Sequence, residues 1–287
     1  MTRLVLLHGI GQQVKGPQTL LADWYPALAD GVTLAGGTLE RQEVAMGFYG
    51  DLFRPVRHRG LGEPDLDASD IEDGLERDLL LAWWEAAAQE ESQVPGPDAA
   101  ARIRTPYLIQ RALDALSHSA FFAGLGERLL ISDAGQVRRY FTEPDLRAAI
   151  RTRFLHALTD RTEVIVAHSL GTVVAYEALC AHPELPDLTL ITLGSPLAVR
   201  GLILDRLVPA PHGGLGRWPA PVKRWTNLAD QGDVVALAKE LAPVFGARVT
   251  DVLVHNGAKA HDVRPYLTAR ETGHAIAVAL GGTAGRH

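Results

Sequence analysis

The sequence predicts an α/β fold in which helices flank a mostly parallel sheet. Short runs of apolar and β-branched residues alternate along the chain with stretches of helical spacing, as in doubly wound sheets. Most of these runs are followed by Gly, Ser, Asp or Asn, which favour turns. A chain of 287 residues with 47% hydrophobic residues can bury one large core. We therefore expect a single domain over residues 1–287.

The expected strands are short, and their continuous apolar runs indicate burial on both faces of the sheet. The first, at residues 4–7, leads directly into the glycine-rich turn at residues 8–11. The other expected strands cover residues 43–49, 163–167, 188–193, 222–228 and 249–254. Because ligands of such sheets gather beyond the carboxyl ends of the strands, we expect the site in the loops that follow them.

Helical periodicity predicts the elements between these strands. The expected helices cover residues 19–29, 144–158, 172–180, 234–241 and 265–280. From about residue 51 to residue 141 the alternation stops, because helical patterns recur there without a convincing strand. These helical patterns cover residues 75–90, 107–116 and 124–131.

We interpret residues 51–141 as a helical insertion within the domain. An insertion after an early strand can form a lid over a site. Two aromatic pairs lie in this insertion, Trp83-Trp84 and Phe121-Phe122. They either line an apolar pocket under the lid or pack the core of the insertion itself.

The composition excludes several classes of protein. The 34 acidic and 28 basic residues give a net charge of −6, and no basic block could neutralise a run of phosphates, so we expect no nucleic-acid partner. Cys180 is the only cysteine, which excludes an internal disulfide, and we interpret it as a buried helix residue. The sequence has neither a secretory signal nor an uninterrupted apolar run of eighteen residues. We therefore expect a cytoplasmic protein without a transmembrane segment.

The strongest motif lies where the expected strand at residues 163–167 meets a helix. It reads A-H-S-L-G over residues 167–171, which is close to G-x-S-x-G, with Ala167 in place of the first glycine. A serine on such a strand–turn–helix projects its hydroxyl from the sheet as a nucleophile. The alternative is that Ser169 only caps the helix. We favour the nucleophile, because the strand–turn–helix context is what the motif demands.

Acyl transfer also requires N–H donors for the oxygen on which negative charge develops. The N–H of Leu170 begins the helix after Ser169, and the N–H of Ile10 lies in the turn after the first strand. We predict that these two groups form an oxyanion hole. The residues expected around the substrate are His8, Gly9, Gly11 and His168.

The acid and then the histidine are expected after the serine in chain order. Two carboxylates, Asp230 and Asp233, follow the expected strand at residues 222–228. We prefer Asp233, although it could cap the next helix, and keep Asp230 as the reserve acid.

Three late histidines, His255, His261 and His274, are candidates for the base. His261 is preferred because it lies in a loop, from which its ring can turn toward Ser169. His274, inside the terminal helix, is the second candidate. We expect His255 to pack at the end of its strand.

These motifs resemble the α/β-hydrolase superfamily, and within it small bacterial lipase- and esterase-like proteins. The resemblance rests on HGIG at 8–11, AHSLG at 167–171, GSP at 194–196, WTNLADQGDVV at 225–235 and AHDVRPYL from residue 260. In such sequences an aspartate before an apolar pair is the acid and a histidine shortly before Tyr-Leu is the base, which favours Asp233 and His261. The first strand comes early in the chain, which suggests a sheet trimmed at its amino-terminal edge, as in some compact lipases.

The resemblance implies a serine hydrolase that cleaves a carboxylic ester, lipid or thioester through an acyl-enzyme, without metal or organic cofactor. Its partner would be a small-molecule ester or acyl substrate, and the oligomeric state is left open. A serine peptidase or amidase, and an inactive binding module on the same scaffold, are the alternatives.

A metal enzyme is disfavoured, because no H-E-x-x-H or paired-cysteine pattern occurs. An acidic stretch matches several positions of a calcium-binding loop. Its residues are Asp65, Asp67, Ser69, Asp73 and Glu76. Asp70 stands where that loop needs glycine, so we interpret the stretch as an acidic helix start.

Overall fold

A computed structural model describes residues 1–54, 66–72, 74–97, 105–119, 122, 127–257 and 260–281. The chain divides into two compact units. The first combines Met1–Leu52 with Ala148–His287, and the second is Phe53–Arg147. The second unit corresponds closely to the expected insertion at residues 51–141, so the helical insertion is present.

The first unit is built on one six-stranded sheet with all its strands parallel, in the order β2-β1-β3-β4-β5-β6. The strands are β1 (Leu4–Leu7), β2 (Val44–Gly47), β3 (Val164–His168), β4 (Leu188–Leu193), β5 (Val222–Asp230) and β6 (Val249–Val254). Each lies within two residues of the bounds expected from the sequence. The fully buried runs β1, β3 and β4 have the continuous apolar character of strands covered on both faces.

The strand order places a topological switch point between β1 and β3. The chain leaves β1 to form β2 on one side, and later returns to form β3 on the other side. Leu7 at the end of β1 pairs with Ala167 in β3. The turn after β1 and the turn after β3 therefore lie beside each other at the carboxyl edge, where open α/β sheets bind their ligands.

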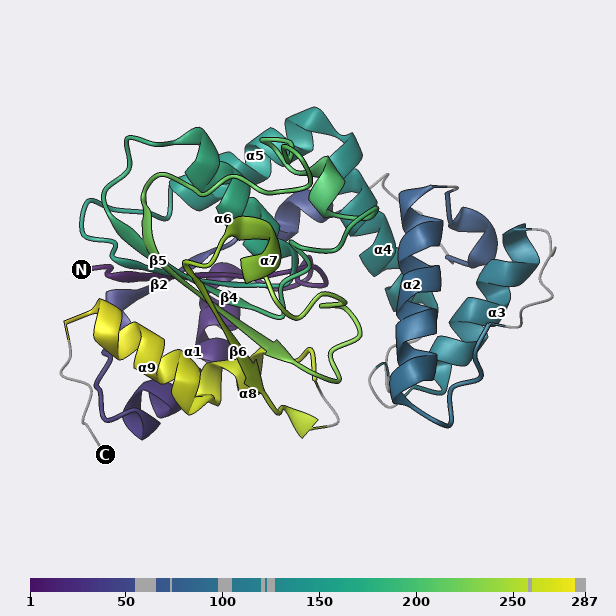
Figure 1. Ribbon diagram of the computed structural model, residues 1–287, viewed down its shortest axis with the longest axis horizontal. Coiled ribbons are helices and arrows are strands. Elements are labelled where there is room, and N and C mark those ends of the chain that lie inside the picture. Colours follow the sequence, from purple (N-terminus) through teal and green to yellow (C-terminus); the bar gives the residue numbers. More distant parts are fainter. Residues whose placement is uncertain are drawn as a thin grey trace. The chain divides into compact units, whose positions relative to one another are not determined.

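Helices cover both faces of the sheet (Figure 1). On one face lie α1 (Pro17–Leu34), α8 (Val263–Thr268) and α9 (Arg270–Ala279), which pack on Leu4, Leu6 and the same-facing residues of the other strands. On the other face α6 (Leu170–Ala181) contacts β1 and β3. The remaining helices of this unit are most of α5 (Pro144–Leu155), α7 (Ala242–Phe245) and the short 3-10 turns Arg41–Glu43, Gly50–Phe53 and Leu204–Arg206.

The helices α1, α8 and α9 lie so close together at two glycines that their backbones are in contact. A Cβ added at Gly273 of α9 would lie 1.9 Å from the carbonyl oxygen of Gly31 in α1. A Cβ added at Gly31 would lie 2.2 Å from the carbonyl oxygen of Leu267 in α8. Neither position can accept a side chain without moving the helices apart.

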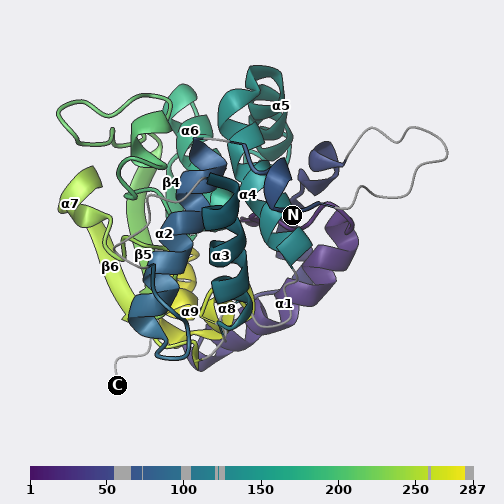
Figure 2. The same ribbon diagram turned by 90° about the vertical axis from the view of Figure 1, so that its right-hand side faces the viewer.

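The second unit is helical, with α2 (Leu75–Glu90), α3 (Thr105–Ser117) and α4 (Glu127–Thr142), the 3-10 turn Ala68–Asp70, and the start of α5 (Pro144–Leu155). Figure 2 shows α2 and α3 side by side. Trp84 is buried and its indole N–H donates to the carbonyl of Pro95 at 2.6 Å. The Trp83 ring lies 6.2 Å from the ring of Phe122, while Phe121 lies outside the described residues. These contacts are internal to the insertion, and a lid role for it stays a prediction.

The acidic stretch before α2 also has internal roles. Asp67 caps the turn Ala68–Asp70 through the N–H of Ser69 at 2.7 Å. Glu76 is buried and pairs with Arg138 of α4 at 2.7 Å. Asp65 and Asp73 lie outside the described residues.

Two expected helices are wrong in detail. Residues 234–241 form an irregular loop, because side chains of the strands bind their backbone groups: Asn227 of β5 donates to the carbonyl of Lys239, and Asp251 of β6 accepts from the N–H of Leu241. The expected helix at residues 265–280 is split into α8 and α9. The split falls at Ala269, whose φ of −56° and ψ of 131° are not helical.

Cys180 lies on α6 as expected, although its side chain is only partly buried. Burial raises the pKa of its thiol to about 11. Among the helices of the described residues, none combines the length and the apolar character needed to cross a bilayer.

We expect Gly273→Ala to lower the free energy of unfolding by about 2 kcal/mol, because the added methyl group overpacks the contact between α9 and α1. Chemical denaturation measures the change. Gly96→Ala is the control, since a Cβ there would only touch that of Ala88 at 3.7 Å. Equal stability of the two variants would contradict the close packing of these helices.

Candidate active site

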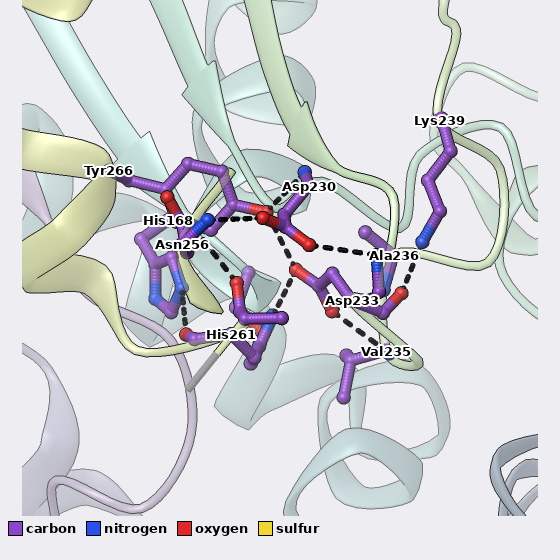
Figure 3. Close-up of polar contacts among 12 residues, drawn as sticks. His168, Asp230, Asp233, Val235, Ala236, Lys239, Asn256, His261 and Tyr266 are labelled. Atoms are coloured by element: carbon purple, nitrogen blue, oxygen red, sulfur yellow. Dashed lines mark hydrogen bonds and ion pairs between the residues drawn. The ribbon is translucent and has the colours of Figure 1, made fainter. Parts of the chain in front are cut away.

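Three loops at the carboxyl edge of the sheet bring together Ser169, His261 and Asp233. Ser169 follows β3, Asp233 follows β5, and His261 follows β6. The Oγ of Ser169 lies 3.0 Å from Nε2 of His261. Nδ1 of His261 lies 2.8 Å from Oδ2 of Asp233, and Figure 3 shows these two side chains facing each other. Because a carboxylate only accepts, Nδ1 carries the proton, and Nε2 accepts from the serine hydroxyl. We call these three residues the triad.

The backbone of Ser169 forms a sharp turn. Its φ of 52° and ψ of −129° make it the one non-glycine with left-handed φ in the part of the chain that the structure describes. Such a conformation costs on the order of 1–3 kcal/mol and persists only where the surroundings impose it. Ser169 occupies the N-cap position of α6, but its side chain makes no capping hydrogen bond. The hydroxyl contacts His261 instead.

Two glycines permit this turn. A Cβ at Gly171 would lie 2.4 Å from the carbonyl oxygen of His8. A Cβ at Gly9 would lie 2.7 Å from the Cβ of Ser169. Both positions must therefore lack a side chain for α6 and the turn after β1 to approach Ser169.

The same approach brings the turn after β1, which carries Ile10, toward the serine and the start of α6. Leu170 is the first residue of α6, so its N–H has no carbonyl partner within the helix and lies at the positive end of the helix dipole. Ile10 directly follows Gly9, whose Cα packs against Ser169. Gly11 has a φ of 75°, which turns the chain away toward α1.

Asp233 is fully buried and its carboxylate accepts four hydrogen bonds. Oδ2 accepts from His261 and from the Tyr266 hydroxyl at 2.9 Å, while Oδ1 accepts from the N–H groups of Val235 at 3.0 Å and Ala236 at 3.1 Å. Burial opposes ionisation, but His261, the N–H of Ala236 and the charge of Lys239 outweigh it, and the pKa of Asp233 is lowered. The acid is therefore an anion at neutral pH.

Asp230, the reserve acid, is buried, but its carboxylate accepts hydrogen bonds from groups outside the triad. Its Oδ1 accepts from the N–H of Gly232 at 2.7 Å, and its Oδ2 accepts from the N–H of Asn256. Asp230 thus ties the end of β5 to the turn after β6, and the hydrogen bond to the His261 ring comes from Asp233.

The other two late histidines lie away from the triad. His274 is exposed on α9. The side chain of His255 is 92% exposed, so the expectation that it packs at the strand end is wrong. It points outward because β6 is an edge strand of the sheet.

His8 and His168, expected to surround the substrate, are buried among protein groups. Nδ1 of His8 donates to the carbonyl of Gly9 at 2.7 Å, and Nε2 accepts from the N–H of Tyr49 at 3.1 Å. Nε2 of His168 donates to the carbonyl of His261 at 2.9 Å, which holds the backbone of the base. Burial lowers the pKa of His8 to about 4 and, together with the charge of His261, that of His168 to about 3.

Two contacts of Asp233 could not be predicted from the sequence. Gly194, at the end of β4, has a φ of 52°, and a Cβ there would lie 2.8 Å from Oδ2 of Asp233. The hydroxyl of Tyr266 donates to the same oxygen. Both residues lie inside motifs noted above, but nothing in a linear motif indicates which side chain reaches Asp233.

Within the described ranges, no group of three or more His, Cys, Asp or Glu side chains is placed to hold a metal ion. Comparison of the chain with known protein families, with curated proteins and with solved structures found no match. What the fold establishes is an α/β architecture with a six-stranded parallel sheet and a helical insertion.

The two buried histidines predict a pH-dependent stability. Their pKa values are about 4 and 3 in the folded chain and 6.5 when exposed, so between pH 6.5 and pH 4 the unfolded chain binds more protons. The free energy of unfolding should therefore fall as the pH falls through this range, with a slope approaching about 1.4 kcal/mol per pH unit for each histidine.

Denaturation at several pH values measures this slope. His8→Gln and His168→Gln should each reduce the slope by the contribution of one histidine, whatever the absolute stability of the variant. His274→Gln, which replaces an exposed histidine, should leave it as in the wild type. An unaltered slope in the first two variants would mean that these rings do take up protons in the folded chain.

Proposed function

We propose that this protein is a serine hydrolase of the α/β-hydrolase type that cleaves a carboxylic ester through an acyl-enzyme. Ser169 is the nucleophile, His261 the general base and acid, and Asp233 the residue that orients His261. The observation that carries the proposal is the hydrogen-bonded series from Ser169 through His261 to Asp233, with distances of 3.0 and 2.8 Å.

In the first half-reaction, the Ser169 Oγ attacks the carbonyl carbon of the ester while its proton moves to Nε2 of His261. The carbonyl oxygen becomes an oxyanion, which accepts from the N–H groups of Leu170 and Ile10. Collapse of this tetrahedral intermediate breaks the bond to the alcohol oxygen, which takes the proton from His261. The products are the free alcohol and an ester of Ser169.

In the second half-reaction, water attacks the acyl group and gives a proton to His261. The Ser169 oxygen leaves, recovers that proton from His261 and releases the carboxylic acid. The imidazolium formed in each half is stabilised by the adjacent Asp233 carboxylate, whose lowered pKa keeps it ionised.

The surroundings of the triad support this chemistry. The backbone of Ser169 has the strained strand-to-helix turn expected of a nucleophile elbow, at the switch point of the sheet. The serine, acid and histidine follow one another in the chain order of α/β-hydrolases. The neutral His8 and His168 bring no competing charge to the site.

The choice of an ester over an amide or peptide follows the resemblance to lipase- and esterase-like sequences. A fold supports many substrates, so the substrate class must be tested directly. Hydrolysis of p-nitrophenyl esters of increasing chain length, compared with the matching anilides, measures this preference.

We expect a fluorophosphonate probe to label the protein at Ser169, because only an activated serine attacks such a phosphorus centre. Mass spectrometry of the peptides locates the label. Ser169→Ala should abolish labelling, and His261→Ala should reduce it about 10³-fold or more. Ser195→Ala is the control, since this buried serine bonds to Thr172 and not to the triad. A wild-type protein without label would indicate a binding module instead of an enzyme.

The two aspartates provide a second test. We expect Asp233→Asn to lower the rate of ester hydrolysis about 10³- to 10⁴-fold, because the amide no longer holds the reactive tautomer of His261. Asp230→Asn removes a carboxylate that accepts from backbone N–H groups and lies 4.0 Å from Nδ1 of His255, outside the triad, and should cost less than about tenfold. Rates are compared per folded molecule, as judged by circular dichroism. Equal or reversed losses would overturn Asp233 as the acid.

A further inference from the structure

The acid of the triad has a second side-chain partner that its role in catalysis does not by itself require. The hydroxyl of Tyr266 lies 2.9 Å from Oδ2 of Asp233, the oxygen that also accepts from His261 (Figure 3). Two donors thus converge on one carboxylate oxygen, one from a general base and one from a neutral phenol.

The direction of the Tyr266 hydrogen bond is fixed by a third group. The phenolic oxygen accepts from the N–H of Asp230 at 2.8 Å, so its own proton is left to point at Asp233. The side chain is fully buried, which excludes competing water. Burial also raises the pKa of Tyr266, so the hydroxyl stays protonated and remains a donor.

Tyr266 and His261 lie in one short segment with local hydrogen bonds of its own. Asp262, the residue after His261, caps α8 by accepting from the N–H of Arg264 at 3.0 Å. Tyr266 lies on α8, and its carbonyl accepts from the hydroxyl of Thr272 at 2.6 Å. Tyr266 on α8 and His261, just before the N-cap of α8, therefore donate to one carboxylate.

From this geometry we infer that Tyr266 is a positioning residue of the triad. By donating to Oδ2 of Asp233, its hydroxyl holds the carboxylate in the orientation in which it binds Nδ1 of His261. Without the hydroxyl, Oδ2 keeps a single donor, and the carboxylate can rotate about the two N–H groups that hold Oδ1. The inference rests on the proposed function, because the role of His261 does.

Tyr266→Phe tests the inference, since it removes only the oxygen atom. Tyr176→Phe is the matched control. Tyr176 is also fully buried, and its hydroxyl also accepts a backbone N–H, that of Arg217 at 3.0 Å, but it donates nothing to Asp233. Both variants should lose a comparable part of the free energy of unfolding, so stability alone does not distinguish them.

The first measurement is the second-order rate constant for labelling of Ser169 by a fluorophosphonate, as a function of pH. In Tyr266→Phe we expect this constant to fall about tenfold or more at its plateau, as for other small misplacements of catalytic groups. The midpoint of the pH profile should also rise, because a carboxylate with fewer donors favours the imidazolium. Tyr176→Phe should match the wild type in both respects. A profile of Tyr266→Phe equal to that of the control overturns the inference.

The second measurement does not depend on activity. The proton on Nδ1 of His261 should give a separate NMR signal, whose chemical shift reports its bond to Asp233. Tyr266→Phe should move or broaden this signal, and Tyr176→Phe should not. If the wild type is not labelled, the proposed function is wrong, while the NMR signal of His261 still tests the contact of Tyr266 with Asp233. If labelling occurs and the signal is unmoved in Tyr266→Phe, the inference fails and the proposed function stands.

Discussion

The parallel arrangement of the sheet is the constraint on which the site depends. Ser169 and His261 are 92 residues apart in the chain, and no local structure could bring them together. Parallel strands end at a common edge, so the loops after β3, β5 and β6 meet there by construction. The position of β1 beside β3 adds a fourth loop, whose glycine at position 9 packs on the serine. The geometry of the site is thus a product of strand order more than of any one loop.

The elements that the sequence predicts well are those in which burial and local preference agree. The strands at residues 4–7, 188–193 and 249–254 are found at the predicted positions. The runs at residues 4–7 and 188–193 are apolar and buried throughout, as expected for strands covered on both faces. The turn at Ser169 can also be predicted from the sequence. Small residues are required at positions 9 and 171, because the backbone after β1 comes close to Ser169 and to the start of α6.

The errors fall where tertiary hydrogen bonds override local preference. Residues 234–241 have helical periodicity, yet Asn227 donates to the carbonyl of Lys239, and Asp251 accepts from the N–H groups of Leu241 and Ala242. Asn227 and Asp251 belong to β5 and β6, which pair only in the folded sheet. Periodicity carries no information about such partners, and for the same reason it does not predict the contact of Tyr266 with Asp233.

The backbone contact of α1 with α8 has a consequence for how the site responds to heat. Gly31 lies against the carbonyl of Leu267, the residue after Tyr266, so α8 is held against α1 beside the site. Many catalytic loops loosen well below the melting temperature of their scaffold. Here Leu267 cannot shift without separating packed helices, so the contact of Tyr266 with Asp233 should persist until the helical layer itself melts.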